Sequence, residues 1–568
     1  MKTIQYFLSV LLIFTAIACK KDYLQRDTGV PIDFEKIFSD PKLAAGFGDN
    51  SYNSLIRDYS RLVGAKGMTA QFGDEAITSN GENVIVVMNS GQYLSTSATD
   101  VVGIYNTMYV GIRNANVMLA NMDRVPWDKD PAYNPSFIKG EQYFLRAFFY
   151  FELMKRFGGV VLLNKPQTIG ESNEDLSRGT YQETAAFILK DLDLAASLLP
   201  LEWPSTSAYG RATKGAVLAL KSRTLLHMAS PLNNSKSSID VVGDASLWKN
   251  AAKAAKDVID LNIYALEANY ADILSRTNSK EYIMIKIRGP RLYNDPSAPY
   301  IIDFLSPPSY GGNQSTLSVT QNHVDLYEAV KKTGTTIVSA FPITDPISGY
   351  DKNNPYLNRD PRFYNNIIYN DMIWQGRKVE TFTGGRDMLA ASPFYTKTSY
   401  YLKRLWPEIL KSGSNASEFV NFVYFRYAEI LLNYAEAINE ANGPTAESFT
   451  AYNAVNLVRN RAGMPNLPIG LTKDQMRERI RNERAVEFAF EDMRWWDILR
   501  WKKGVDLVAQ PMKAMKITKT GSAFTYEVIA LGADFQKTFM DYMHLYPIPL
   551  AEFNKSAAGL VQNPGWIK

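Results

Sequence analysis

Three glutamates near the C-terminus of this chain have a spacing that could support chemistry. Glu483, Glu487 and Glu491 follow one another at intervals of four residues. On a helix this spacing places the three carboxylates along one face, where they could bind a metal ion or transfer protons. The same segment contains Arg484 and Arg494 and has no histidine. Because arginine neighbours keep carboxylates ionised, we interpret the segment as a buried, arginine-paired contact between helices.

The same segment also predicts local ion pairs and a buried aromatic surface. An arginine lies three residues from each of three carboxylates, close enough to pair on a helix. The predicted pairs are Arg484 with Glu487, Glu491 with Arg494, and Asp497 with Arg500. The large rings of Trp495, Trp496 and Trp501 are expected in the core rather than on a surface that stacks against sugars.

No other catalytic arrangement stands out in the sequence. His227, His323 and His544 lie far apart in the chain, and there is no G-x-S-x-G nucleophile elbow, phosphate-binding loop or well-placed dinucleotide fingerprint. The single cysteine and the few histidines rule out a disulfide framework and a Cys/His zinc site. We therefore predict a protein that is not an enzyme and needs no cofactor. Whether an ion orders one of its loops is left open.

The composition is that of an ordinary globular chain of 568 residues. Lys and Arg number 62, Asp and Glu number 58, and the formal net charge is +4. This even balance argues against nucleic acid as a partner, because phosphate binding usually shows a clustered basic excess. Apolar residues make up 46 % of the chain and aromatic residues 12 %, so a large core and many stacking surfaces are expected.

The first residues predict export and lipid modification. An uncharged, mostly apolar run of about 15 residues extends from Ile4 to Ala18, shorter than the roughly 20 residues of a membrane span. It ends in small residues directly before Cys19, the only cysteine, and so resembles a bacterial lipobox, with Ala16 where leucine is most common. We predict a lipoprotein signal peptide over 1–18 and lipidation of Cys19. The alternative is an A-x-A cleavage site followed by an incidental cysteine.

Residues 19–35 are predicted to form a lipidated tether between a membrane and the folded body. They are largely polar, and two or three acyl chains would hold the protein stably, whereas one chain is marginal at about 0.8 kcal/mol per buried methylene. No later segment has the roughly 18 consecutive apolar residues that a membrane helix requires. The protein is therefore expected to be anchored to the membrane by lipid and not to span it.

Helical periodicity covers both ends of the mature chain. Apolar residues recur at intervals of three and four, and glycine and proline mark the breaks. The predicted helices are 104–122, 136–157, 184–199, 213–229, 248–261, 424–439, 451–461 and 473–501. Their pairing at intervals of roughly 34–40 residues favours a mainly α, tetratricopeptide-like scaffold of helical pairs.

Between these helical regions the periodicity disappears. Residues 278–418 are rich in proline and glycine, with aromatic residues scattered among them. A structureless loop of this length is uncommon, so we predict an irregular, loop-rich subdomain with short strands, and place ligand binding there. It would separate an N-terminal helical-pair region over 36–277, which has its own loop insertion, from a C-terminal helical-pair region over 419–568.

Distinctive motifs occur in order along the chain. They are the helix 140–151 followed by Gly158-Gly159, the block 213–226, the turn Arg359-Asp360-Pro361-Arg362-Phe363, the segments 425–437, 456–463 and 483–497, and the tail motifs 546–549 and 562–566. Together they resemble the SusD/RagB family of outer-membrane nutrient-uptake lipoproteins. The resemblance covers essentially the whole mature chain.

The resemblance implies both a fold and a role. The fold would be a largely α-helical body with four tetratricopeptide-like units. The role would be that of a lipoprotein on the outer membrane, exposed at the cell surface, which captures oligosaccharide or polysaccharide. It would deliver this glycan to a SusC-like TonB-dependent transporter.

Two loop regions contain the residue types that recognise sugars. Sugars present flat apolar faces with hydroxyl rims, so their sites combine exposed rings with amide or carboxylate groups. The candidates are Asn83, Asn89 and Tyr93 in the first region, and Tyr293, Tyr300, Tyr310, Asn313 and Trp374 in the second. For each residue the alternative is a loop anchor packed on its own subdomain.

Two other functions stay open. A peptide-binding member of the same family would favour a groove with backbone-pairing edges or charged pockets over aromatic platforms. A helical glycoside hydrolase would need two carboxylates about 5–10 Å apart across a cleft, and nothing in the sequence marks such a pair. We rank glycan capture first, peptide capture second and hydrolysis last.

Overall fold

The computed structural model describes most of the chain. The described residues are 33–56, 58–59, 67–79, 83–97, 101–167, 176–204, 208–234, 244–293, 305–312, 315–555 and 560–567. The predicted signal peptide, Cys19 and most of the predicted tether lie outside them, as do Tyr300 and Asn313. Among the helices within these ranges, none is long and apolar enough to cross a membrane.

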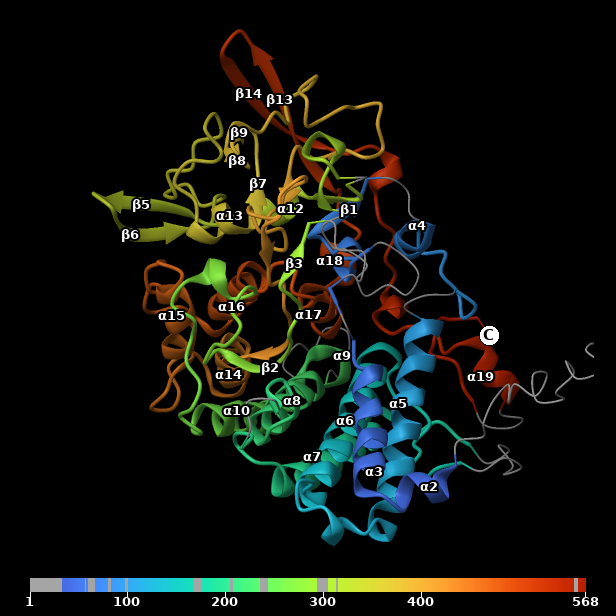
Figure 1. Ribbon diagram of the computed structural model, residues 1–568. Coiled ribbons are helices and arrows are strands. Elements are labelled where there is room, and N and C mark those ends of the chain that lie inside the picture. Colours follow the sequence, from blue (N-terminus) through green and yellow to red (C-terminus); the bar gives the residue numbers. More distant parts are fainter. Residues whose placement is uncertain are drawn as a thin grey trace, which may run out of the picture.

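Helices form the body of the protein (Figure 1). In chain order the α-helices are α2 (Phe34–Phe38), α3 (Pro41–Asp49), α4 (Asn83–Asn89), α5 (Val102–Asn121), α6 (Pro135–Phe157), α7 (Tyr181–Leu198), α8 (Lys214–Ala229), α9 (Pro231–Asn234), α10 (Ala245–Ile259), α12 (Gln321–Val324), α13 (Pro361–Asn366), α14 (Tyr427–Asn442), α15 (Ala451–Arg461), α16 (Lys473–Glu487), α17 (Arg494–Arg500), α18 (Gly504–Leu507) and α19 (Leu550–Lys555). Each of α5, α6, α7 and α8 packs against the next, α8 packs on α10, and α10 packs on α14. The predicted mainly α scaffold of helical pairs is confirmed.

Side-chain caps fix where the long helices begin and end. The Asn134 side chain accepts hydrogen bonds from the first turn of α6. Thr180, Thr450 and Thr472 form capping boxes at the starts of α7, α15 and α16. Gly158 ends α6 with a φ of 75°, a backbone conformation that glycine adopts without the strain imposed on other residues.

Helix α6 lies at the centre of the helical body. Every residue from Phe144 to Phe157 is buried, as expected for a helix that is apolar around most of its circumference. Its close packing against α5 depends on Gly111, where a Cβ atom would lie 2.4 Å from the ring of Phe149. A larger residue at this position would force the two helices apart.

Short strands join distant parts of the chain. The strands are β1 (Ala76–Thr78), β2 (Tyr282–Lys286), β3 (Arg291–Leu292), β4 (Leu317–Val319), β5 (Ala329–Thr333), β6 (Thr336–Phe341), β7 (Ile367–Ile368), β8 (Ile373–Trp374), β9 (Arg377–Lys378), β10 (Tyr401–Leu402), β11 (Ser417–Glu418), β12 (Phe422–Arg426), β13 (Lys513–Thr520) and β14 (Ala523–Ala530). They form two-stranded antiparallel sheets, in which β1 pairs with β4, β2 with β12 and β3 with β11. The predicted irregular region with short strands is confirmed, and its strands also pair with segments outside it.

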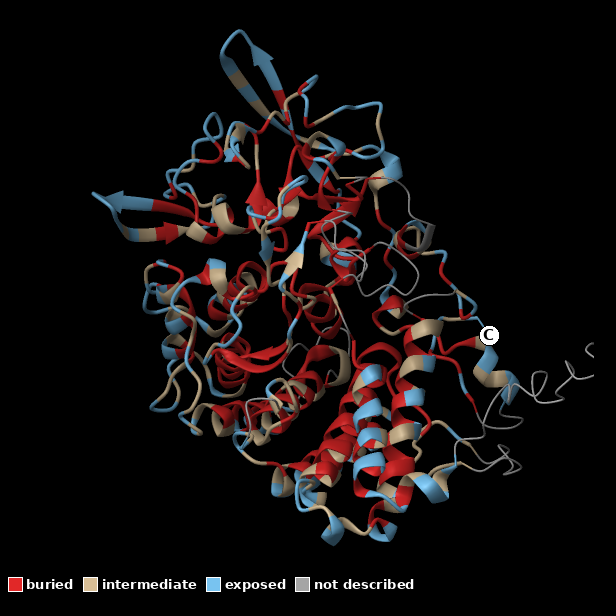
Figure 2. Ribbon diagram, viewed as in Figure 1, coloured by how far each residue is buried: buried red, intermediate tan, exposed pale blue. Residues whose placement is uncertain are grey.

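Two hairpins, β5–β6 and β13–β14, project from the body (Figure 1). Gly334 and Gly521 begin their turns, each with a φ of 61°, as tight hairpin turns require. The outer ends of both hairpins are exposed, whereas the strands at the base of the loop region are buried (Figure 2). Most buried hydrophobic residues of the loop region are part of the same hydrophobic core as those of the helical body.

The predicted helix over 473–501 is instead two helices, α16 and α17, separated by a turn. In that turn Phe490 has a φ of 60°, which is incompatible with a continuous helix. Its backbone N–H donates to Oε1 of buried Glu75 at 2.9 Å. The single-helix prediction is wrong because this contact comes from a distant segment. Residues 424–426, predicted to begin the helix 424–439, belong instead to strand β12, because this strand pairs with β2.

The C-terminal part of the chain closes over the segment that leads into β1. The buried ammonium group of Lys537 donates hydrogen bonds to three backbone carbonyls in this segment. The acceptors belong to Gln71 (2.7 Å), Gly73 and Ala76 (2.8 Å). Burial lowers the pKa of Lys537 to about 7. Nearby, Arg494 pairs with Asp74 at 2.8 Å, so residues separated by more than four hundred positions hold one turn in place.

Candidate functional site

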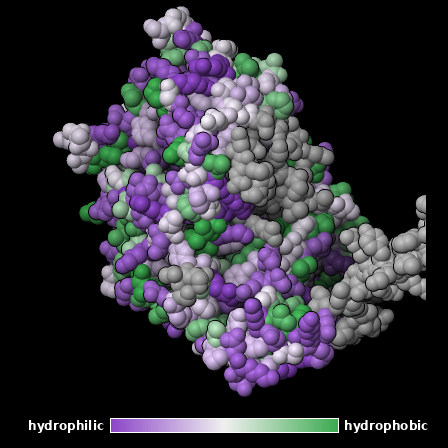
Figure 3. All heavy atoms as spheres, viewed as in Figure 1, coloured by the Kyte–Doolittle hydropathy of each residue, from purple (hydrophilic) through white to green (hydrophobic). Residues whose placement is uncertain are grey.

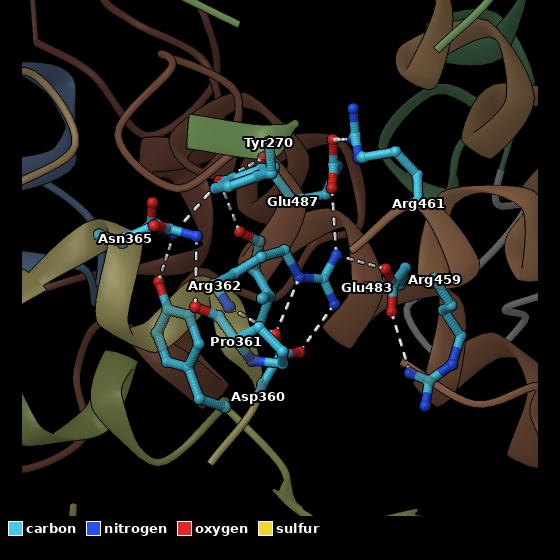
Figure 4. Close-up of polar contacts among 12 residues, drawn as sticks. Tyr270, Asp360, Pro361, Arg362, Asn365, Arg459, Arg461, Glu483 and Glu487 are labelled. Carbon is cyan, nitrogen blue, oxygen red and sulfur yellow. Dashed lines mark hydrogen bonds and ion pairs between the residues drawn. The ribbon is translucent and has the colours of Figure 1, made fainter. Parts of the chain in front are cut away.

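The evenly spaced glutamates lie in a buried network of arginines and carboxylates (Figure 4). Glu487, the last residue of α16, accepts hydrogen bonds from Arg362 at 3.1 Å and Arg426 at 2.6 Å. It also pairs with Arg461. All four side chains are buried, so three guanidinium groups enclose this carboxylate.

The turn before α13 joins the loop region to this network. The carboxylate of Asp360 accepts the backbone N–H of Arg362 at 2.9 Å, which caps α13. Its two oxygens also accept from the Arg362 guanidinium at 3.1 and 2.8 Å. The same guanidinium donates to Glu483 at 2.6 Å. The Asp-Pro-Arg motif therefore connects the loop region to α16.

Arg426, at the end of β12, connects Glu281 and Glu491 to Glu487. Its guanidinium donates to Glu491 at 2.8 Å, to Glu281 at 2.7 Å and to Glu487 at 2.6 Å. Glu491 also accepts from Arg404 at 2.8 Å. One buried guanidinium thus holds three carboxylates that come from different elements.

The electrostatics of the network favour a structural role. Burial by itself would raise the pKa of Glu487, but the charges of Arg461, Arg426 and Arg362 lower it to about 2. Such a carboxylate stays ionised near neutral pH and is a poor proton donor. Within the described ranges, no group of three or more His, Cys, Asp and Glu side chains could hold a metal ion. The interpretation as an arginine-paired contact between helices is confirmed.

Only one of the predicted local ion pairs forms. Asp497 pairs with Arg500 at 2.8 Å. Arg484 binds Asp497 at 2.8 Å instead of Glu487, and Arg494 binds Asp74. The other two predictions are wrong because the turn between α16 and α17 brings Asp497 to Arg484 and leaves Arg494 next to Asp74. The tryptophans of this segment are buried, as predicted: Trp495, Trp496 and Trp501.

The three histidines occupy separate places in the core. Each packs edge-on against a phenylalanine ring. Burial lowers the pKa of His227, His323 and His544, and that of His323 falls to about 3. They are therefore uncharged packing residues near neutral pH.

The structure gathers three of the predicted glycan-binding aromatics into one cluster of the loop region. The rings of Tyr310 and Trp374 both pack against Trp406, with centroids 5.8 and 5.5 Å away. The Tyr293 hydroxyl lies 2.9 Å from Oγ of Ser306 and donates to the Tyr310 carbonyl at 3.5 Å. The fold thus brings together residues that are spread over about eighty positions of the sequence.

These rings lie inside the cluster rather than on its surface. The exposed fraction is 2 % for Tyr293, 7 % for Tyr310 and 0 % for Trp374. The Arg377 guanidinium covers the Tyr310 ring at 3.7 Å from its centroid and is held by Asp387 at 2.7 Å. Stacking of a sugar needs an open ring face. The expectation of open ring faces is corrected for these three residues, whose rings are packed inside the described part of the loop region.

Among the candidates of the first loop region, Tyr93 lies against the C-terminal tail. Tyr93 is 3 % exposed, and its ring packs on Trp566 at 4.7 Å between centroids. It is therefore also a core residue rather than an open platform. The half-buried Asn89 donates from its side-chain amide to the Gln71 carbonyl at 3.1 Å. Asn83 is the first residue of α4.

Together these features define a class of protein: a scaffold of helical pairs that supports a loop-rich region, with its most distinctive charged motifs used for packing. Hydrophobic side chains are scattered among hydrophilic ones over the visible face (Figure 3). The chain belongs to the SusD family, whose sequence model matches residues 280–566. A second family, described as starch-binding and associating with the outer membrane, matches residues 49–226.

Known relatives agree with this assignment. SusD-like protein P38 of Formosa agariphila is 25 % identical over 415 residues, 71 % of this chain and 73 % of the relative. SusD-like protein P2 of the same organism is 24 % identical over 524 residues, 87 % and 90 % of the two chains. The resemblance seen in the sequence motifs is confirmed.

Solved structures share the fold. A SusD-like protein of Bacteroides fragilis is 26 % identical and superimposes with a TM-score of 0.75 over 94 % of this chain and 99 % of the other. A SusD-like carbohydrate-binding protein of the same species, 23 % identical, superimposes with a TM-score of 0.72 over 92 % and 99 %.

Proposed function

We propose that this protein is a lipoprotein at the cell surface that captures oligosaccharide or polysaccharide without cleaving it. It would deliver the glycan to a SusC-like TonB-dependent transporter of the outer membrane. Membership of the SusD family over most of the chain carries this proposal. A related structure from Bacteroides fragilis is a carbohydrate-binding protein, and one from Bacteroides fluxus is a surface glycan-binding protein, which supports a glycan as the ligand.

We place capture on the loop region, 278–418, together with the loops near α4. The buried cluster around Trp406 would hold these loops in a fixed shape, and preorganised loops bind at lower entropic cost. The proposed direct contacts are Asn83, Asn89, Tyr300 and Asn313. Tyr93, Tyr293, Tyr310 and Trp374, whose rings are buried, would support the described parts of these loops.

Native affinity electrophoresis tests the proposal. The chain from residue 20 onward is run through gels that contain starch, pectin, xylan, arabinan or mannan, with a protein of similar size that binds no glycan as the control. Retardation by one polymer, with no shortening of that polymer, is the expected result and would identify the glycan. Shortening of the polymer would favour the glycoside hydrolase instead. Unchanged mobility in every gel, together with binding to a peptide library, would favour peptide capture.

Cys19→Ser is expected to release the protein from the membrane fraction while its melting temperature stays the same. Cys19 is the residue that would carry the acyl chains, and without them the chain has no strong attachment to the bilayer. Fractionation of cells after salt and carbonate washes measures the change. Ser9→Ala, a substitution inside the predicted signal peptide, is the matched control and should leave the protein with the membranes. If the Cys19→Ser protein still sediments with outer membranes, the lipid anchor is not what holds it.

A further inference from the structure

A cleft on the helical body, apart from the loop region, has the size and chemistry of a ligand site. It lies between α5, the segment 161–167 and α19, and its volume is about 400 Å³. Small-molecule sites typically measure roughly 300–1,000 Å³. None of the sequence motifs discussed above lines this cleft, so neither the charge network nor the aromatic cluster accounts for it.

Two tyrosines from successive turns of α5 form its floor. The rings of Tyr105 and Tyr109 lie 4.8 Å apart with an angle of 38° between their planes. The Tyr109 hydroxyl donates to the Val161 carbonyl at 2.8 Å, and burial raises the pKa of both phenols. Tyr105 is buried while Tyr109 is half-buried. The floor is therefore an uncharged aromatic surface held in one orientation, with Tyr109 partly open to the cleft.

The wall opposite the helix is fixed in place. The Asn116 amide donates to the carbonyls of Leu163 at 3.0 Å and Lys165 at 3.3 Å. Its own carbonyl accepts from Arg146 at 2.6 Å. Because Asn116 is fully engaged in this way, it shapes the wall and does not serve as a ligand contact. The cleft is preformed, which lowers the entropic cost of binding.

Charged side chains are present at the rim of the cleft. Among the described residues that line it, three are cationic and one is a carboxylate: Arg113, Lys165, Lys555 and Glu552. Glu552 and Lys555 pair with each other at 2.6 Å. Arg113 donates from one guanidinium nitrogen to the Gln167 carbonyl at 3.1 Å, and no carboxylate in the described part of the chain pairs with it. The other N–H groups of the Arg113 guanidinium can therefore donate hydrogen bonds to a bound ligand.

We propose that this cleft binds an acidic saccharide, with a uronic-acid carboxylate paired to Arg113 and the sugar ring against the floor at Tyr109. A guanidinium group matches a carboxylate in geometry and charge. An aromatic face suits the apolar face of a sugar ring, and the exposed amide of Asn106 at the rim suits its hydroxyl groups. The site goes beyond capture by the loop region and does not depend on it.

Calorimetric titration with trigalacturonic acid tests this inference, using the mature chain with Cys19→Ser. The acidic trisaccharide is expected to bind, and the neutral trisaccharide maltotriose is expected to bind at least about tenfold more weakly. Arg113→Gln should weaken binding of the acidic trisaccharide by about tenfold or more. Arg124→Gln is the matched control: this arginine lies just beyond the end of α5, pairs with Glu35 and lies outside the cleft. It should bind as the parent does.

A second variant tests the same cleft without changing its charge. Val110 lines the rim and is 55 % exposed, so Val110→Trp should fill the cleft and abolish binding without changing the melting temperature. The inference is overturned if both Arg113→Gln and Val110→Trp bind as the parent does, if maltotriose binds equally well, or if triglutamate binds better than trigalacturonate. Gels of neutral polysaccharide report on the loop region, whereas pectin contains galacturonic acid and could also bind the cleft. The pectin gel is therefore repeated with Arg113→Gln, so that either proposal can fail without the other.

Discussion

Arg426→Met is expected to lower the free energy of unfolding by about 3–5 kcal/mol, the usual cost of removing one partner from a buried ion pair. The Arg426 guanidinium is buried and holds Glu281, Glu487 and Glu491 at 2.6–2.8 Å. Methionine keeps much of the volume but leaves these carboxylates short of compensating charge in a region of low dielectric. Urea unfolding followed by circular dichroism measures the loss.

Two comparisons make the Arg426 result specific. Arg386→Met is the matched control, because Arg386 is half-exposed and lies 3.6 Å from Glu380. It should cost less than about 1 kcal/mol, as surface pairs do. Adding Glu491→Gln to Arg426→Met should restore part of the stability, because one uncompensated charge is removed. If Arg426→Met costs no more than Arg386→Met, the buried network does not stabilise the fold.

Acidification from pH 5 to pH 2 is expected to remove several kcal/mol of stability. Burial would raise the pKa values of Glu487 and Asp497, but arginine neighbours lower both to about 2, from ordinary values of 4.5 and 3.8. A depressed pKa adds stability that is fully present above the unfolded-state value and is lost as the pH falls toward the folded-state value. At 1.36 kcal/mol per pKa unit the two groups together contribute on the order of 5 kcal/mol.

Unfolding by urea at pH 7, 5 and 3 measures this acid sensitivity. Asp497→Asn should be less stable than the parent at pH 7, because Arg484 and Arg500 lose a charged partner. It should also lose less stability between pH 5 and pH 3, because one of the two titrating groups is gone. Asp193→Asn, which alters an exposed carboxylate, should show the same acid sensitivity as the parent. If the free energy of unfolding is the same at pH 5 and pH 3, the low pKa values of Glu487 and Asp497 are contradicted.

Local patterns in the sequence predicted the helices well where local interactions decide the structure. Residues 451–461 are predicted as a helix and form α15 with the same bounds, because a capping box marks its start and Gly463 and Pro465 follow its end. The prediction of one helix over 473–501 fails because α16 ends at Glu487 and the turn that follows is held by a hydrogen bond from Phe490 to Glu75. Rules for residues three or four apart contain no information about a partner more than four hundred positions away.

The aromatic residues of the candidate site also depend on contacts that local sequence patterns do not predict. The sequence predicts Tyr310 and Trp374 as glycan contacts of the loop region, and in the structure both rings pack on Trp406. It gave no measure of exposure, because burial of these rings depends on Trp406 and on Arg377, which covers Tyr310. Neither residue carries a local signal of that role. Lipidation of Cys19 and the contacts at Tyr300 and Asn313 lie outside the described residues and stay predictions.

The contacts of Lys537 and Arg494 with residues 71–76 have a consequence for the order in which the chain can fold during synthesis. A ribosome makes the N-terminal segment first, yet Asp74 then lacks Arg494, and the carbonyls of Gln71 and Ala76 lack the ammonium group that holds them. An unfinished chain therefore cannot complete its own N-terminal half. Such a chain stays open until its tail has been made, which is compatible with the export that we propose from its predicted signal peptide.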